Sequence, residues 1–457
     1  MRPEELKGAR VAVAGLGRSG LAAIELLVRR GARVTAADVK PLEELPEAAA
    51  KLEALGVAFE RQSPEVFARA ELVVLSPGVP VEIPELEEAR RRGVRIVGEV
   101  ELAAWFLQGP VIGITGSNGK TTTTALVGHI LRECGVPVQV GGNIGFPPTA
   151  MVASSRPEQW NVLELSSFQL ETIETFRAEV AAVLNVTPDH LDRHRTMEAY
   201  AAAKRRILET QEAGDTAILN RDDAVCRGFA AAVKGAARWF SSAGRLESGA
   251  WMEGGWIVLD GRRLVEASQV PLRGRHNLEN VMAAAEAACV AGAPLEAIAA
   301  AVRSFPGVEH RLEYVRTVGG VDWFNDSKAT NVDAAVKAVA AFAGPLWVIL
   351  GGKDKGGDYR PLREALRGKT RAALLIGAAA QKIAAALDGA VEAIRCGTLA
   401  AAVEEAWRRA RPGDTVLLAP ACASFDQFHS FEHRGRVFKE LVGKLEEKPR
   451  EEAKNCA

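Results

Sequence analysis

The chain lacks an excess of charge of either sign, and its cysteines lack any paired spacing. Its 57 lysines and arginines stand against 58 aspartates and glutamates, which gives a formal net charge of -1. There is therefore no electrostatic reason to expect nucleic acid or an anionic membrane as a partner. The scattered cysteines fit reduced thiols in a cytosol better than a disulfide framework or a zinc site. They are Cys134, Cys226, Cys289, Cys396, Cys422 and Cys456.

Long uninterrupted apolar runs are also missing. Charged residues, including Glu4 and Lys7, precede the first apolar stretch, so the start of the chain has no signal-peptide core. The alanine-rich stretch 281–302 is broken by a proline and two glutamates, which argues against a membrane span. We expect a cytoplasmic protein with no membrane insertion.

The chain has the length and composition of a multidomain globular protein. At 457 residues it is too long for one ordinary core, and its 48% hydrophobic and 25% charged residues are globular values. Short apolar strands alternate with helices, which predicts parallel, doubly wound α/β sheets. Strands are expected at 10–14, 33–37, 72–75, 160–165, 181–185, 216–220, 346–350, 372–376 and 415–418.

We divide the chain into three α/β domains at 1–97, 98–303 and 304–457. The first and third are expected to be Rossmann-like, and the central one to resemble a P-loop ATPase. Tryptophan-rich runs around two glycine turns in 237–271 predict a small antiparallel excursion in the central domain. A helix is expected at 276–291 and another from Pro294, followed by a linker at 304–308.

The most informative segment is G-I-T-G-S-N-G-K-T at 113–121. It follows the apolar run 111–114 and precedes a helix-like stretch at 122–131, which is the order of a phosphate-binding loop. Lys120 would reach the outer phosphates of ATP, and the Thr121 hydroxyl would hold Mg²⁺. The generic P-loop has glycine where this chain has Ile114, so the match is to a shorter T-G-x-x-G-K-T variant.

A second glycine loop, G-L-G-R-S-G at 15–20, follows the first strand, and Asp38 ends the next one. This spacing fits a dinucleotide site and hence a dehydrogenase. It fits equally any nucleotide diphosphate held at a helix N-terminus, because the backbone reads phosphate and not nicotinamide. Asp38 reads equally well as a strand-end carboxylate in a turn. Two phosphate loops favour two phosphorylated substrates.

Two more side chains belong with the ATP loop, and a third is considered beside them. Glu164 ends a strand, at the edge where open α/β sheets bind ligands, and its carboxylate can hold Mg²⁺. His190 follows another strand at the same edge. Lys204 would by default be an exposed helix cation, and composition alone gives it no other role.

Seven motifs resemble the Mur ligases of peptidoglycan synthesis. They are T-G-S-N-G-K-T (115–121), N-I-G (143–145), E-L-S-S-F-Q-L (164–170), T-x-D-H-L-D-R (187–193), N-D-S-K-A-T-N (325–331), G-G-K-D-K (351–355) and P-A-C-A-S-F-D-Q-F (420–428). The resemblance covers all three predicted domains.

The resemblance implies a role for each matching position. ATP would contact Gly116, Asn118, Gly119, Lys120, Thr121, Thr122, Asn277, Asn280, Arg311 and Asp326. A UDP-sugar would contact Arg18, Ser19, Asp38, Gly78, Asn143 and His190. D-Glutamate would contact Lys328, Thr330, Lys355, Ser424 and Phe431. Of two Mg²⁺ ions, one would lie on Thr121 and Glu164, and the other on His190 and a carbamylated Lys204. The catalytic set would be Lys120, Glu164, His190 and Lys204.

The implied activity is an ATP-dependent ligation. ATP would phosphorylate the terminal carboxylate of UDP-N-acetylmuramoyl-L-alanine, and the amine of D-glutamate would displace phosphate, in a protein expected to be a monomer. A sister ligase for another amino acid and a folate polyglutamate ligase are alternatives, against which 325–331 and 420–428 weigh. An oxidoreductase, resting on loop 15–20, and a nucleotide-gated regulatory protein are alternatives of other classes.

Overall fold

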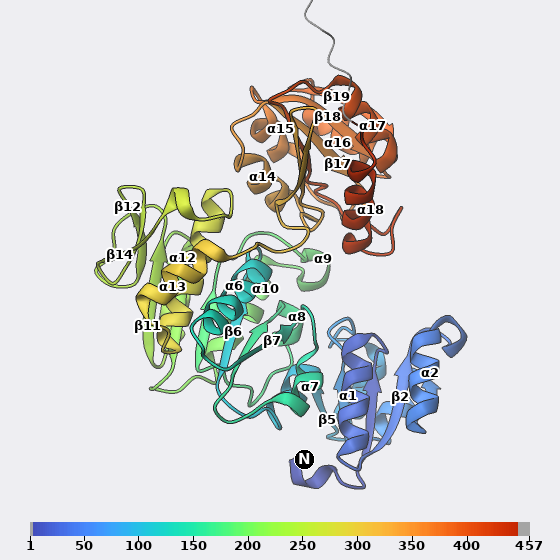
Figure 1. Cartoon of the computed structure of the whole chain (residues 1–457). Coiled ribbons are helices and arrows are strands. Elements are labelled where there is room, and N and C mark those ends of the chain that lie inside the picture. Colours follow the sequence, from blue (N-terminus) through green and yellow to red (C-terminus); the bar gives the residue numbers. More distant parts are fainter. Residues whose placement is uncertain (1–2, 447–457) are drawn as a thin grey trace, which may run out of the picture. The chain divides into compact units, whose positions relative to one another are not determined.

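The computed structural model describes residues 3–446, and its strands form three separate sheets. In Figure 1 the first sheet is blue, the second runs from cyan to yellow, and the third is orange to red. The described residues divide into two compact units. One holds the residues up to Gln269 together with Glu279–Phe305, and the other holds Val270–Leu278 and the residues from Pro306 onward. No described helix is long and apolar enough to cross a membrane.

The first sheet is fully parallel, with strand order β3-β2-β1-β4-β5. Every residue of Leu-Val-Val-Leu in β4 is buried, as expected for a parallel strand covered on both faces. Its strands are β1 (Arg10–Ala14), β2 (Arg33–Asp38), β3 (Ala58–Arg61), β4 (Leu72–Leu75) and β5 (Arg95–Gly98). Its helices are α1 (Arg18–Arg29), α2 (Pro46–Leu55), α3 (Pro64–Ala68) and α4 (Glu87–Arg91).

The second sheet has nine strands in the order β14-β13-β12-β11-β10-β9-β6-β8-β7. They are β6 (Val111–Thr115), β7 (Val138–Gly142), β8 (Trp160–Glu164), β9 (Val180–Val183), β10 (Thr216–Asn220), β11 (Ala236–Ser241), β12 (Ala250–Glu253), β13 (Trp256–Leu259) and β14 (Arg262–Glu266). The helices are α5 (Glu99–Ala104), α6 (Lys120–Glu133), α7 (Pro148–Met151), α8 (Ser167–Leu170), α9 (Leu191–His194), α10 (Met197–Arg205), α11 (Ala224–Gly228), α12 (Arg275–Val290) and α13 (Leu295–Ser304).

The third sheet has the order β15-β16-β20-β17-β18-β19 and is parallel apart from the β15–β16 hairpin. Its strands are β15 (Glu313–Val318), β16 (Val321–Asn325), β17 (Leu346–Gly351), β18 (Thr370–Ile376), β19 (Glu392–Gly397) and β20 (Thr415–Leu418). Its helices are α14 (Val332–Ala340), α15 (Arg360–Leu366), α16 (Ala380–Leu387), α17 (Leu399–Arg409) and α18 (Phe431–Gly443).

Short 3₁₀ turns complete the described elements. They are η1 (Pro3–Leu6), η2 (Leu42–Glu44), η3 (Pro84–Leu86), η4 (Val152–Ser154), η5 (Arg206–Leu208), η6 (Phe229–Ala232) and η7 (Ala267–Gln269).

The predicted α/β class is confirmed, and all nine predicted strands are present within a few residues of the expected ends. The antiparallel excursion was predicted to start too early. β11 pairs parallel with β10, because α11 and η6 carry the chain back across the sheet before it. Antiparallel pairing starts only between β12 and β13. Cys456 lies outside the described residues.

Helix α5 belongs to two cores and carries a buried acid at its start. Its Leu102 packs in the core of the first sheet, whereas its Val100 packs in the core of the second. The Oε1 atom of Glu99 accepts hydrogen bonds from the backbone N and the Oγ1 of Thr149, both at 2.7 Å. The Oε2 atom has no hydrogen-bond partner among the described residues. Burial raises the pKa of Glu99 to about 7, although the Thr149 hydrogen bonds oppose the shift.

We expect Glu99→Gln to stabilise the protein at alkaline pH. The folded state keeps the Glu99 proton up to about pH 7, whereas the unfolded chain releases it from about 4.5, so unfolding free energy falls as pH rises between them. Glutamine keeps the acceptor for Thr149 and removes this titration. At pH 8 the variant should gain about 1 to 3 kcal/mol in urea unfolding, and less than about 1 kcal/mol at pH 5. An equal gain at both pH values would contradict this account.

Candidate active site

The loop between β6 and α6 has no room for side chains at its glycines. Gly116 and Gly119 have φ values of 153° and 89°. A Cβ added at Gly119 would lie 2.2 Å from Oδ1 of Asn280, and one at Gly116 would lie 3.0 Å from Cβ of Leu184. Helix α6 begins at Lys120, directly after the loop. A bare backbone at a helix N-terminus is the geometry that binds phosphate.

The first turn of α6 carries the remaining predicted residues of the loop. Thr121 and Thr122 follow Lys120 and are each 5% exposed. Asn118 lies just before them, and its backbone N donates to Oδ1 of Asn185 at 2.8 Å, while Nδ2 of Asn185 donates to the Asn118 carbonyl at 3.0 Å. This reciprocal pair ties the loop to the chain that follows β9.

Ser117 makes a second connection from the loop. Its Oγ donates to the Thr187 carbonyl at 2.9 Å and lies 3.1 Å from the Tyr200 hydroxyl. Tyr200 is 1% exposed and belongs to α10, the helix that also carries Lys204. We did not predict Tyr200. Its only sequence signal was its position four residues before Lys204, on the same face of the helix.

Two lysines donate to the same carbonyl oxygen. Nζ of Lys120 donates to the carbonyls of Gly116 and Ser117 at 2.8 and 2.9 Å. Nζ of Lys204 also donates to the Gly116 carbonyl at 2.8 Å, and it lies 4.5 Å from the centre of the Tyr200 ring. Lys204 is 1% exposed, so the exposed helix cation that composition alone suggested is excluded.

The surroundings of Lys204 favour its uncharged amine. Burial and the nearby charge of Lys120 lower the pKa of Lys204 well below its ordinary value, although Asp189 and Glu164 oppose the shift. A neutral amine carries the lone pair that an ammonium lacks, and can therefore act as a nucleophile.

Glu164 ends β8, between β6 and β7 in the sheet. Its side chain is 1% exposed, and Oε1 accepts a hydrogen bond from Nδ2 of Asn143 at 3.0 Å. Asn143 follows β7, and its backbone N donates to the Glu164 carbonyl at 2.8 Å. Ile114, just before the phosphate loop, lies in register with Glu164 on the neighbouring strand. The predicted carboxylate therefore lies at the strand edge that carries the phosphate loop.

His190 follows β9 in a left-handed conformation, with φ 54°. Its backbone N donates to Oδ1 of Asp189 at 3.0 Å, and its Nε2 lies 3.6 Å from Oδ2 of the same carboxylate. The imidazole meets the Phe168 ring edge-on, with 4.9 Å between ring centres. Asp189, whose charge also acts on Lys204, thus links the two residues predicted for the second Mg²⁺ site.

The structure brings five of the six residues predicted for the UDP-sugar into one cavity of about 570 Å³. They are Arg18, Ser19, Asp38, Gly78 and Asn143. His190 does not line this cavity. Because Asn143 also donates to Glu164, it connects the cavity wall to the strand edge beside the phosphate loop.

Both carboxylate oxygens of Asp38 accept backbone hydrogen bonds. Leu16 N donates to Oδ2 at 2.8 Å, and Lys40 N donates to Oδ1 at 2.9 Å. Asp38 is therefore a strand-end carboxylate in a turn that also lines the cavity, and the same contacts hold the glycine loop against the end of β2. Helix α1 starts at Arg18, because Gly17 has extended backbone and caps it.

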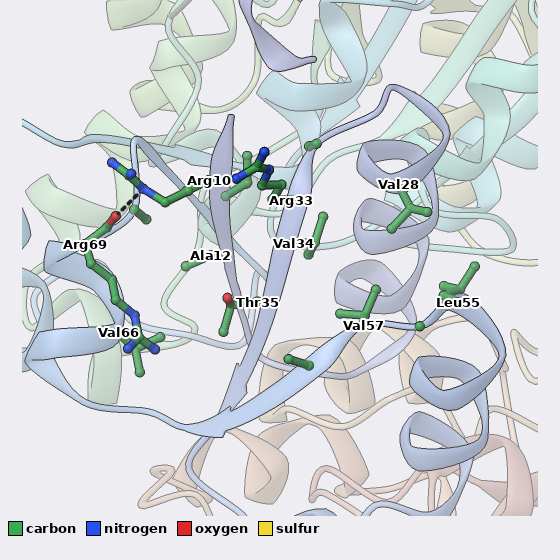
Figure 2. A pocket seen from close by; sticks show the side chains of 15 residues that line it. Arg10, Ala12, Val28, Arg33, Val34, Thr35, Leu55, Val57, Val66 and Arg69 are labelled. Atoms are coloured by element: carbon green, nitrogen blue, oxygen red, sulfur yellow. Dashed lines mark hydrogen bonds between the residues drawn. The ribbon is translucent and has the colours of Figure 1, made fainter. Parts of the chain in front are cut away.

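A second cavity, of about 410 Å³, lies at the other end of the first sheet (Figure 2). Arg10 and Arg33, which begin β1 and β2, and Arg69 line it, and Nε of Arg10 donates to the Arg69 carbonyl at 3.0 Å. It holds none of the predicted residues and lies at the amino ends of the strands. Ligands of such sheets bind at the carboxyl ends.

The remaining predicted ATP residues lie on α12 and in the second unit. Asn277 and Asn280 are one turn apart on α12, and Nδ2 of Asn277 donates to the Arg273 carbonyl at 2.7 Å. Asp326 is 4% exposed, and burial raises the pKa of its carboxyl group to about 6 although Arg311 opposes the shift. Oδ1 of Asp326 and Nε of Arg311 have no hydrogen-bond partner within residues 3–446.

Four of the five residues predicted for D-glutamate belong to connected segments of the second unit. Nζ of Lys328 lies 5.1 Å from the centre of the Phe431 ring, and Thr330 N donates to the Lys328 carbonyl at 2.8 Å. Ser424 is 2% exposed and follows Ala423, which accepts a backbone hydrogen bond from Lys353. Lys355, the fifth, is exposed.

Arg434 braces these segments and was not predicted. It is 0% exposed, and its guanidinium donates to Oγ and the carbonyl of Ser327 at 3.0 and 2.8 Å. It also donates to the carbonyls of Cys422 and Ala423 at 3.3 to 3.4 Å. Burial lowers the pKa of Arg434 to about 10. No local sequence signal separates this arginine from an exposed one on a helix.

Comparison with known proteins agrees with this arrangement across all three sheets. Residues 9–98 match the MurD-like N-terminal domain of Mur ligases, 114–288 the Mur ligase middle domain, and 310–422 the Mur ligase glutamate ligase domain. The UDP-N-acetylmuramoylalanine--D-glutamate ligase of Solibacter usitatus is 62% identical over 97% of this chain and 100% of its own length. The protein of the same name from Acidobacterium capsulatum is 52% identical over 96% and 97%.

Solved structures share the fold at low identity. The UDP-N-acetylmuramate-alanine ligase MurC of Thermotoga maritima has a TM-score of 0.60 at 19% identity, covering 95% of this chain and 99% of that one. The MurF ligase of the same organism, in complex with ADP, has a TM-score of 0.60 at 17% identity, covering 97% of each chain. Together with the near full-length relatives, these matches place the chain in the Mur ligase family.

Proposed function

We propose that this chain is an ATP-dependent ligase that adds D-glutamate to UDP-N-acetylmuramoyl-L-alanine in the cytoplasmic synthesis of peptidoglycan precursors. The proposal draws on the family and on the activity named for relatives 62% and 52% identical. Its main structural support is the group formed by Lys120, Lys204 and Glu164 at the phosphate loop, with Asn143 joining Glu164 to the cavity wall.

The proposed reaction has two chemical steps. The terminal carboxylate of the UDP-sugar attacks the γ-phosphorus of ATP, which forms an acyl phosphate and releases ADP. The amine of D-glutamate then attacks the acyl carbon, the tetrahedral intermediate expels phosphate, and the amine loses its proton. Lys120 and the bare backbone of the loop offset the charge that builds on the transferring phosphoryl group.

The residues proposed to hold two Mg²⁺ ions fit that role on one condition. Thr121 and Glu164 offer oxygen ligands at the phosphate loop, and His190 offers a nitrogen. Lys204 fits only as an anion, which its amine becomes by bonding to the carbon of CO₂ and losing a proton. Its lowered pKa favours the neutral amine that this step needs. When bound, Mg²⁺ would neutralise phosphate charge during the transfer.

We assign the remaining predicted residues to the two other ligands. Asn118, Asn277, Asn280, Arg311 and Asp326 bind the nucleotide. D-Glutamate is held by Lys328, Thr330, Lys355, Ser424 and Phe431, where two ammonium groups suit its two carboxylates. The domains 1–97, 98–303 and 304–457 carry the UDP-sugar, ATP and amino-acid sites, in a protein that works as a monomer.

Arg18→Ala should weaken UDP-sugar binding about tenfold, because it removes a cation from the start of α1 in the 570 Å³ cavity. Calorimetry of the full chain with UDP-N-acetylmuramoyl-L-alanine measures this directly, and Arg29→Ala, at the far end of the same helix, is the matched control. The parent should show no binding of micromolar NAD. Tight NAD binding that Arg18→Ala weakens would favour the oxidoreductase alternative.

A further inference from the structure

Arg193, the last residue of the D-H-L-D-R run, has a side chain that reaches back to a loop of the first sheet. It belongs to helix α9, which begins directly after His190, and its side chain is only 15% exposed. Its Nη1 donates to the Pro77 carbonyl at 3.2 Å, and its Nη2 donates to the Val79 carbonyl at 3.3 Å. Nη2 also donates to Oε2 of Glu171 at 2.7 Å, which fixes the guanidinium in this direction.

The two carbonyls flank Gly78 in the wall of the proposed UDP-sugar cavity. Pro77, Gly78 and Val79 all line that cavity. They follow β4 as an irregular turn, whose position along the cavity wall is not set by sheet pairing. The Arg193 guanidinium, which donates to the carbonyls on either side of Gly78, therefore fixes the position of this part of the cavity wall.

The Arg193 guanidinium also stacks on the ring of Phe168, which contacts a histidine of the proposed reaction centre. Its guanidinium carbon lies 4.3 Å from the centre of Phe168. The same ring meets His190 edge-on at 4.9 Å and stacks on His194 at 5.4 Å. Phe168 follows Glu164 by four residues, at the start of α8. Arg193 thus contacts the wall of one proposed site and the ring that supports the histidine of the other.

We infer that Arg193 is a positioning residue that sets the UDP-sugar cavity in register with the phosphoryl-transfer site. The inference rests on the proposed function. A lysine cannot replace it, because its single ammonium group cannot donate to two carbonyls and a carboxylate while stacking on a ring. Without the fork, the substrate carboxylate loses its alignment with the γ-phosphate, and misplacement of a reacting group by about 1 Å can cost ~100-fold in rate.

The test compares Arg193→Lys with the parent, using the full chain. In calorimetry without ATP, the dissociation constant of UDP-N-acetylmuramoyl-L-alanine should rise about tenfold, because the cavity wall loses its two hydrogen bonds. In steady state kcat should fall by about 10- to 100-fold. The KM for ATP should change less than about twofold, since Arg193 touches no residue of the phosphate loop.

A matched control and a chemical rescue separate positioning from simple stability. Arg195→Lys alters the nearby arginine, which is 80% exposed and pairs with exposed Glu82, and it should behave as the parent. Guanidinium at low millimolar concentration should partly restore Arg193→Ala, whereas methylammonium should not, because only the planar fork reproduces the contacts. If Arg193→Ala has a lower melting temperature but an unchanged UDP-sugar affinity, and guanidinium does not rescue it, the role of Arg193 is merely structural and the inference is overturned.

Coupling through Phe168 gives an independent check. Phe168→Leu removes the ring that Arg193 and His190 share, so its effect on kcat should not multiply with that of Arg193→Lys. If the two substitutions lower kcat by fully multiplicative factors, Arg193 does not act through Phe168. If the parent neither binds the UDP-sugar nor forms the amide, the proposed function has failed. If the parent does both and Arg193→Lys matches it within twofold, only the inference about Arg193 has failed.

Discussion

Lys120→Ala is expected to lower kcat/KM for amide formation by about 1000-fold while the protein stays folded. Lys120 begins α6, and its Nζ donates to two carbonyls of its own loop. Its removal costs about 1 kcal/mol for each of these hydrogen bonds. In the proposed reaction, in contrast, the transferring phosphoryl group would lose a positive charge that stabilises it.

The measurement is the rate of peptide formation by Lys120→Ala, with the melting temperature as the check on folding. Lys234→Ala is the matched control, because Lys234 precedes β11 and its exposed side chain donates to the Glu209 carbonyl. It should keep full activity. Substantial turnover by folded Lys120→Ala would show that ATP does not bind at this loop.

Lys204→Ala is expected to lose at least about 99% of the activity, although helix substitutions of this kind are usually tolerated. The side chain is buried, and its lowered pKa favours the neutral amine that the proposed reaction with CO₂ needs. Small carboxylates should restore part of the lost rate, about tenfold at high millimolar concentration, because they return an oxygen anion to the cavity that alanine leaves.

Two variants separate this role from packing. Lys204→Met fills the same space without a charge, so it should be as inactive as Lys204→Ala, yet acetate should not rescue it. Arg205→Ala, at the next position, removes an exposed side chain with a weak ion pair to Glu209 and should be active. The rate of amide formation by each variant across a series of acetate concentrations distinguishes the two roles. If Lys204→Ala matches the parent, Lys204 has no part in the reaction.

The sequence predicted those features that depend on residues close together in the chain. The phosphate loop and Asp38 were found because glycine spacing, strand ends and helix starts repeat wherever a backbone binds phosphate. The cavity residues Arg18 and Gly78 were assigned from the resemblance to the Mur ligases. The parallel sheets followed from buried apolar runs. The position of β11 was missed because the tryptophan-rich run reads the same in parallel and antiparallel pairing.

The rest depended on contacts between segments that are distant in the chain. Arg193 reaches a loop 114 residues away, and Arg434 reaches one 107 residues away. Neither arginine is distinguished from a surface arginine by its neighbours in sequence. The burial of Lys204 was equally invisible, since helix α10 is amphipathic and its lysine stands beside two arginines. The assignment of Val270–Leu278 to the second unit also follows from contacts alone.

The most direct test of the account couples ADP release to peptide formation in one assay. The parent protein is given ATP, Mg²⁺ and UDP-N-acetylmuramoyl-L-alanine, with D-glutamate, with L-glutamate, or with neither. We predict that ADP and the D-glutamyl product form in equal amounts with D-glutamate, and that both stay near background otherwise. ADP release at the same rate without D-glutamate, or the absence of any D-glutamyl product, would contradict the proposed function.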